Sequence, residues 1–177
     1  MSARVFVDTN VFVYARESGD PAKRASAREW LELLWKGLRG RTSIQVLNEY
    51  YAVITQHASF GVSRDDAWSD VSELLEWKPQ EIDREVITQA FENESRYKLN
   101  WWDCLIVASA QAQECILLLS EDLQDGADYG GVIVRSPFTL RIAEEAAAYT
   151  LPPRRVSRHR GRGRPRRNPT QTTDMPG

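Results

Sequence analysis

Two aspartates each stand just beyond a short apolar run in this sequence. Asp8 follows residues 5–7 directly, and Asp122 stands three positions after residues 116–119. Such runs are typical of buried parallel strands. In an open parallel sheet, ligands bind beyond the carboxyl ends of the strands, so both carboxylates are expected at that edge. Each one alone also suits a simple cap on the following helix or turn, because Asp is common at such positions.

Two further acids, Glu49 and Asp103, are expected on the inward sides of helices. Glu49 shares a helical stripe with Val46 and Val53, and Asp103 is followed by apolar residues three, four and seven positions on. A carboxylate in apolar surroundings is costly unless it is paired, protonated or bound to metal. Two simpler placements stay open: Glu49 partly exposed at the edge of its stripe, and Asp103 in the first helical turn behind Asn100 as N-cap, where it favours the helix dipole.

Four carboxylates in one place, without a lysine or arginine nearby in the sequence, would repel one another and raise their pKa values. A divalent cation relieves that repulsion. Carboxylate oxygens suit Mg²⁺ or Mn²⁺, and Mg²⁺ usually keeps several waters that substrate phosphates can replace. The pattern therefore indicates a metal-dependent phosphoryl-transfer site, formed by an acidic quartet of Asp8, Glu49, Asp103 and Asp122.

Alternating strands and helices are expected to position these acids. Apolar runs at 5–7, 116–119 and 132–134 predict strands, and helical periodicity occupies the segments between them. This alternation predicts parallel βαβ units and a three-layer α/β/α sandwich with a short, mainly parallel central sheet flanked by helices. Helix starts are expected at Asp20, which precedes Pro21, at about Ser43, and at Ser63, Asp83 and Asn100.

Two boundaries of these elements can also be predicted. Gly40 is expected to end the helix that begins at Pro21, because glycine is common just after a helix. Residues 77–82 are expected to form a short edge strand, since Pro79 suits an edge better than the centre of a sheet.

Length and composition place the chain among soluble globular proteins. It has 177 residues, 42% of them apolar and 27% charged, which suits one domain with a sizeable core. No apolar run approaches the roughly 18 residues that span a bilayer. An acid at position 8 comes before any signal-peptide apolar region could develop, so no membrane association and a cytoplasmic location are expected. Two cysteines and two histidines fit neither a disulfide framework nor a zinc site.

Charge is divided unevenly along the chain. The overall charge is −2, but residues 151–177 hold eight arginines and one acid, whereas residues 1–150 hold 15 basic and 24 acidic residues. The final segment is rich in Pro, Arg and Gly without apolar periodicity, so it cannot bury a core and is expected to be disordered. We therefore expect one domain over residues 1–150 and a basic tail over 151–177.

Four segments in order resemble the motifs of PIN-domain ribonucleases, and in particular of VapC-like toxins from type II toxin–antitoxin systems. They are VFVDTN at 5–10, QVLNEYY at 45–51, WWDCLIVA at 101–108 and LLSEDL at 118–123. VRSPF at 134–138 also resembles the family's last strand and Pro-Phe turn. The resemblance covers roughly residues 4–145. Each motif is weak alone, but four in order with similar spacing are specific.

The resemblance implies that the acidic quartet holds Mg²⁺ or Mn²⁺ and that neighbouring polar residues support it, namely Thr9, Asn10 and Ser120. Ser120 stands where the family more often has Thr. Glu121 and Asp125 are extra acids, and they leave open which side chain completes the metal shell. The implied reaction is hydrolysis of an RNA phosphodiester by metal-activated water. His57 is expected to be a surface or capping group near a helix end, so the sequence offers no histidine base.

The resemblance also implies partners. Proteins of this kind pair with a small antitoxin, a segment of which lies in the toxin's groove, and they commonly form homodimers. Trp101 or Trp102 could stack an unpaired base, although one core residue and one partly exposed residue is the simpler interpretation.

The basic tail departs from the family pattern. Its simplest role is salt-sensitive, sequence-independent contact with RNA or DNA phosphates, and residues 162–165 also resemble the core of an AT-hook. The arginines expected to make such contacts are Arg154, Arg155, Arg158, Arg160, Arg162 and Arg164.

Three alternative functions stay open. A PIN nuclease of RNA processing or decay would share the site but would have no neighbouring antitoxin gene. Haloacid-dehalogenase-like phosphatases and response-regulator receivers also carry acids on α/β sheets, but Asn10 stands where the phosphatases have a second Asp, and Arg135 lies where receivers usually have Lys. A non-catalytic nucleic-acid-binding module would use the acids only as caps and solvated groups, and would bind no metal.

Overall fold

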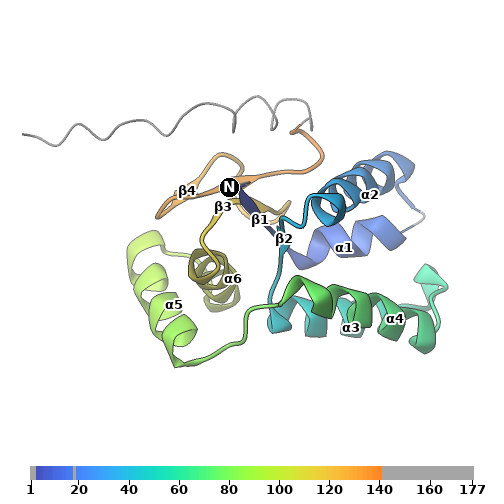
Figure 1. Cartoon of the computed structure of the whole chain (residues 1–177), viewed down its shortest axis with the longest axis horizontal. Helices are drawn as coiled ribbons and strands as arrows, with labels where there is room; N and C mark the ends of the chain where they lie inside the picture. The colour runs from blue at the N-terminus through green and yellow to red at the C-terminus, as the bar shows by residue number, and fades with distance from the viewer. Residues whose placement is uncertain (1–2, 18, 141–177) are drawn as a thin grey trace, which may run out of the picture.

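A five-stranded sheet lies at the centre of the residues that this computed structural model describes, which are 3–17 and 19–140 (Figure 1). Its strands are β1 (Arg4–Val7), β2 (Gly40–Arg41), β3 (Cys115–Leu119), β4 (Asp128–Tyr129) and β5 (Val132–Arg135). Their order is β2-β1-β3-β5-β4, and every neighbouring pair is parallel except β4 and β5. The expectation of a short, mainly parallel central sheet is confirmed.

Six α-helices accompany the sheet over the same residues: α1 (Thr9–Arg16), α2 (Pro21–Lys36), α3 (Ile44–Gln56), α4 (Arg64–Leu74), α5 (Arg84–Tyr97) and α6 (Trp101–Ala112). Helices α1 and α2 connect β1 to β2, whereas α3 to α6 lead from β2 back past β1 to β3. Because parallel crossovers are right-handed, these connections cover opposite faces of the sheet. Figure 1 shows α1 and α2 on one side and α5 and α6 on the other, so the predicted three-layer arrangement is confirmed.

Capping side chains fix where the helices begin. At each of the five predicted starts, the N-cap side chain accepts a hydrogen bond from a backbone N–H of the first turn, which would otherwise lack a partner. These N-caps are Asp20, Ser43, Ser63, Asp83 and Asn100. The short helix α1, with Asp8 as its N-cap, is an addition to the predicted elements.

The prediction that Gly40 ends a helix is wrong. Helix α2 already ends at Lys36, and Gly40 lies in β2, paired with β1. A Cβ atom at Gly40 would lie 2.4 Å from the Trp77 ring, so only glycine lets this indole pack directly on the strand.

The predicted edge strand over residues 77–82 is also wrong. Its first residue ends a 3₁₀ helix, η2 (Leu75–Trp77), and Lys78 then adopts a left-handed conformation with φ of 53°. A left-handed residue turns the chain out of the extended path that strand pairing needs. The segment makes only an isolated bridge, between Gln80 and Ser43.

The central strands are buried on both faces. Val5, Phe6 and Val7 are fully buried, as are Leu118 and Leu119, which explains why these runs are continuously apolar and do not alternate. Both cysteines, at positions 104 and 115, are free and buried, in agreement with the absence of a predicted disulfide. These strands form a rigid base for the residues at their carboxyl ends.

Two expectations concern the ends of the chain and its surroundings. No helix within the described residues is both long enough and apolar enough to cross a membrane. The basic tail over 151–177 and its arginines lie outside the described residues, as does the end of the domain predicted over 1–150.

Candidate functional site

Asp8 lies where β1 meets α1, at the carboxyl edge of the sheet. Its backbone N–H donates to the carbonyl of Leu119 on the neighbouring strand β3, at 3.0 Å. Its buried carboxylate accepts from the Thr9 backbone N–H at 2.7 Å and from the Ser120 hydroxyl at 2.7 Å. The strand thus fixes the backbone while the helix N-terminus and Ser120 fix the side chain.

Asp122 reaches the same edge from the turn after β3. Its backbone N–H donates to Ser120 Oγ at 3.2 Å, and its carboxylate accepts from Asn10 Nδ2 at 3.0 Å. The Asn10 amide also donates to Asp8 Oδ2 at 3.2 Å, and its carbonyl accepts from the Glu121 backbone N–H at 3.3 Å. Asn10 therefore joins the ends of β1 and β3.

Glu49 comes from the middle of α3 and faces the start of α1. Thr9 Oγ1 donates to Glu49 Oε2 at 2.8 Å, and Gln45 Nε2, one turn earlier on α3, donates to Glu49 Oε1 at 2.9 Å. With both oxygens held by neutral donors, the carboxylate is kept at the site in a defined orientation.

Asp103 enters from the first turn of α6. Its backbone N–H donates to Asn100 Oδ1 at 3.0 Å, and the Asn100 amide group donates to its carboxylate. Asp103 is therefore at the N-terminal position where a carboxylate favours the helix dipole, as the simpler interpretation held. The same carboxyl group is close enough to Asp122 and Glu49 to respond to their charges, so its place in the first turn of α6 is compatible with the predicted quartet.

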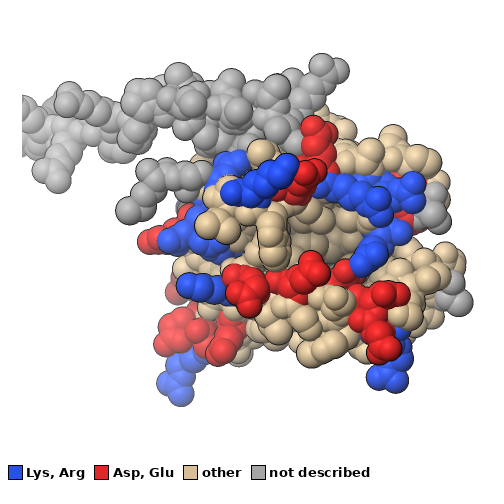
Figure 2. Space-filling view, turned by 45° about the vertical axis from the view of Figure 1, so that its right-hand side comes forward, with Lys and Arg blue, Asp and Glu red and all other residues tan. Residues whose placement is uncertain are grey.

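Asp122 and Glu49 lie near enough to both Asp8 and Asp103 to affect the pKa values of these two carboxyl groups. Burial raises the pKa of Asp8 to about 6, against the lowering effect of the Ser120 and Thr9 hydrogen bonds, and the charges of Asp122 and Glu49 raise it further. Burial likewise raises the pKa of Asp103, which Asn100 lowers and the same two acids raise. Figure 2 shows acidic side chains in a band across the middle of one face of the molecule, with lysines and arginines above it.

The donor set of this quartet fits a hard divalent cation, although the carboxylates are not arranged around a single point. Within the described residues, no group of three or more His, Cys, Asp or Glu side chains stands in a metal-binding arrangement. Within the described part of the chain, the hydrogen-bond donors to the quartet's carboxylates are hydroxyl, amide and backbone N–H groups, all of them neutral. Excess negative charge on hard oxygens is what Mg²⁺ or Mn²⁺ neutralises.

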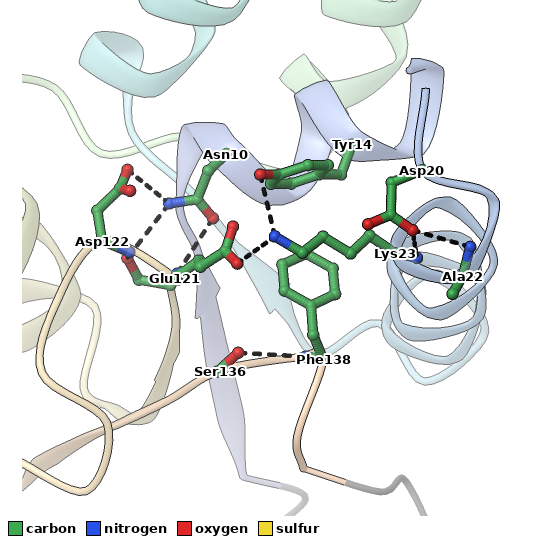
Figure 3. Close-up of polar contacts among 10 residues, drawn as sticks. Asn10, Tyr14, Asp20, Ala22, Lys23, Glu121, Asp122, Ser136 and Phe138 are labelled. Carbon is green, nitrogen blue, oxygen red and sulfur yellow. Dashed lines mark hydrogen bonds and ion pairs between the residues drawn. The ribbon is translucent and has the colours of Figure 1, made fainter. Parts of the chain in front are cut away.

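The extra acids Glu121 and Asp125 are turned away from the quartet. Glu121 forms an ion pair with Lys23 of α2 (Figure 3). The Lys23 ammonium also donates to the Tyr14 hydroxyl at 3.2 Å and lies 5.1 Å from the centre of the Phe138 ring. Asp125 accepts from Arg135 and from the Ser136 backbone N–H. Of the three acids after β3, Asp122 is therefore the one that joins the site.

His57 offers no catalytic base. It is the exposed C-cap of α3, about two turns beyond Glu49, and its ring packs edge-on against Phe60 at 6.0 Å. Among the residues that the structure describes, a proton acceptor at the quartet would have to be a carboxylate or water.

Sequence reasoning missed one supporting residue of the site, Gln45, and one contact beside it, between Lys23 and Glu121. Gln45 could have been found, because it precedes Glu49 by four positions, the spacing at which helical side chains meet. The Lys23 contact gave no signal, since it joins residues 98 positions apart in the sequence.

Comparisons with known proteins agree with this architecture. The family model of the PIN domain matches residues 5–124. Among solved structures, a toxin–antitoxin complex from Klebsiella pneumoniae has 20% sequence identity and a TM-score of 0.57, covering 75% of this chain and 97% of that one.

Two other solved structures are similar in the same way. DNA-bound VapBC from Salmonella typhimurium is 13% identical with a TM-score of 0.56, covering 77% of this chain and 99% of that one. The VapC20 toxin of Mycobacterium tuberculosis, described as cleaving the sarcin-ricin loop, is 17% identical with a TM-score of 0.50, covering 64% and 86%. At these identities the likeness concerns the fold. No curated protein sequence matches the chain.

Proposed function

Because the chain belongs to the PIN domain family, we propose that it is an endoribonuclease that depends on Mg²⁺ or Mn²⁺ and acts as the toxin of a toxin–antitoxin pair. The observation that carries the nuclease proposal is the approach of four carboxylates from four separate elements at one sheet edge, where their hydrogen-bond donors among the described residues are neutral. Such a site attracts a divalent cation, and a phosphodiester is the substrate that a cation so held can bind.

Each residue of the site has a distinct part in this proposal. The residues that would hold the ion are Asp8, Glu49, Asp103 and Asp122. When bound, a divalent ion supplies acidification of water and neutralisation of the charge that develops on the phosphate.

The supporting residues keep the carboxylates oriented. Thr9 and Gln45 each donate to one oxygen of Glu49. The Asn10 amide donates to both Asp8 and Asp122 and so holds the two carboxylates apart. Hydrogen bonds of this kind around metal-binding side chains typically change metal affinity or activity by 10- to 100-fold when lost.

The raised pKa of Asp8 has a functional consequence. A fraction of the metal-free protein carries a proton on this carboxyl group near pH 6, and that proton must leave before the oxygen can bind a cation. Cation binding is therefore expected to weaken as the pH falls through about 6.

The nuclease is tested by incubating the purified full chain with a mixture of structured RNAs, with Mg²⁺ or Mn²⁺ and separately with a chelator. Asp8→Asn keeps the shape of the side chain but removes its charge, and Asp125→Asn is the matched control, since Asp125 contacts Arg135 and Ser136 and not the quartet. The proposal requires cleavage that needs metal and Asp8 but not Asp125. Cleavage that persists in Asp8→Asn would remove the quartet from the mechanism.

The toxin part of the proposal rests on fold similarity to toxin–antitoxin proteins and needs its own test. Expression of the wild-type chain in bacteria should arrest growth, and Asp8→Asn should not. Growth arrest should be relieved by co-expressing a small protein encoded next to the gene, and purification should recover the two as a complex. A nuclease without growth arrest would favour RNA processing or decay as its role.

A further inference from the structure

A pocket of about 510 Å³ opens directly beside the acidic quartet. Glu49 belongs to both, and Trp102, in the pocket wall, immediately precedes Asp103 in α6. The apolar side chains of its wall are Ile44, Ile82, Trp102 and Leu105. Helix α3 adds the polar side chains of Gln45, Asn48 and Glu49. A ligand bound at the quartet can therefore extend past Glu49 into the pocket.

Trp102 presents a large aromatic surface to this pocket. Its side chain is 63% exposed although it is the largest apolar residue of the wall. Its backbone is fixed in the first turn of α6, whose N-cap Asn100 is hydrogen-bonded to the Asp103 N–H. An exposed indole on a rigid helix gives a flat surface suited to stacking, and Trp loses little conformational freedom when it binds.

We propose that this pocket is a subsite for one unpaired nucleobase of the substrate, stacked on Trp102. The inference rests on the proposed ribonuclease function and specifies its substrate as single-stranded RNA near the cut. Nucleobases have two stacking faces, and each one carries an N–H donor on its pairing edge. A base is also neutral, whereas a phosphate in this position would be repelled by Glu49.

Base pairing is incompatible with this subsite. A base within a duplex is stacked on its neighbours and uses its N–H groups for pairing, so it cannot lie on Trp102. The enzyme should therefore cut loops, bulges or single strands in preference to helical RNA.

The subsite is tested by fluorescence anisotropy with labelled short oligoribonucleotides of A, C or U and with an abasic ribose-phosphate oligomer of equal length. The full chain carries Asp8→Asn to prevent cleavage. In this background, Trp102→Ala should lose about tenfold in affinity for the base-bearing oligomers, the order of one stacked base, and nothing for the abasic oligomer. Trp102→Phe should retain most of the affinity, because an aromatic face remains.

Trp68→Ala is the matched control. Trp68 is 59% exposed and lines the neighbouring pocket, which shares Ile44 and Asn48 with this one but not Glu49. Its removal should leave both kinds of oligomer bound as before. The subsite would be overturned if Trp102→Ala lost affinity equally for the base-bearing and the abasic oligomers, or lost affinity for neither.

Failure of the subsite and failure of the nuclease are distinguishable. If wild-type protein cleaves RNA and Trp102→Ala cleaves it with unchanged KM, the subsite is wrong and the nuclease stands. If wild-type protein cleaves no RNA, the nuclease fails, and the binding assay still decides the subsite. If Trp102→Ala binds RNA normally but no longer binds a labelled oligo-arginine peptide that the protein with Trp102 binds, the pocket accepts a basic peptide and the nucleobase proposal is refuted.

Discussion

Asp8→Asn should stabilise the metal-free protein at neutral and alkaline pH, although it removes a residue of the site. Burial raises the pKa of this carboxyl group from 3.8 to about 6 in the folded chain. The folded state therefore binds the proton more tightly than the unfolded state does. Stability falls as the pH rises from about 4 to about 6, and the full penalty of the buried charge applies above that range.

The size of this penalty follows from the pKa difference. A shift from 3.8 to about 6 corresponds to about 3 kcal/mol, at 1.36 kcal/mol for each unit. Asparagine carries no charge, but it weakens the hydrogen bonds that the carboxylate accepts from Ser120 and Asn10. This weakening lowers the free energy of unfolding by about 1 kcal/mol. The net gain is about 2 kcal/mol, or roughly 4–8 °C in melting temperature for a domain of this size.

The assay is thermal unfolding followed by circular dichroism, with chelator present, from pH 4 to pH 8. Asp8→Asn should melt above wild type at pH 8, and the difference should vanish or reverse at pH 4, where the wild-type carboxyl group is largely protonated. Asp125→Asn, which loses the charged partner of Arg135, should not raise the melting temperature at pH 8. A lower melting temperature for Asp8→Asn at pH 8, or a difference independent of pH, would refute the electrostatic reasoning.

Three further predictions concern the bound ion, the hydroxyl of Thr9 and the strand glycine Gly40. Mn²⁺ at about 100 times its dissociation constant should stabilise wild-type protein by about 2.7 kcal/mol, seen as a rise in melting temperature that a chelator reverses. Thr9→Val removes the hydroxyl that orients Glu49 and should lower the RNA cleavage rate about tenfold, whereas Thr88→Val on an exposed helix face should not. Gly40→Ala should lower the free energy of unfolding in urea by about 1–3 kcal/mol, because the new methyl group overlaps the Trp77 ring; unchanged stability would show that the indole moves easily.

The parts of the fold that could be predicted from the sequence are those with local signals. The N-caps at Asp20, Ser63 and Asp83 are recognised from a few neighbouring residues, and a buried parallel strand leaves a continuous apolar run. Strands β2 and β4 have two residues each, which is too short for any periodicity. The false strand at 77–82 arose because nothing in its composition reveals that Lys78 turns the chain in the left-handed conformation.

The candidate site divides in the same way. The four acids could be selected because two follow apolar runs and two lie on inward helix faces. Their surroundings depend on contacts between distant segments, such as Asn10 with Asp122 or Lys23 with Glu121. Asp122 could be placed in the quartet from the sequence, but Glu121 and Asp125 could be set aside only once their own contacts were known.

The central claim is that the acidic quartet is one metal-binding site, and anomalous X-ray scattering from crystals grown with Mn²⁺ tests it most directly. We expect an anomalous peak bounded by Asp8, Glu49, Asp103 and Asp122, in contact with Asp8 and at least one other member of the quartet, and absent from Asp8→Asn crystals. Mn²⁺ bound only elsewhere, with this edge of the sheet empty at saturating concentration, would contradict the claim.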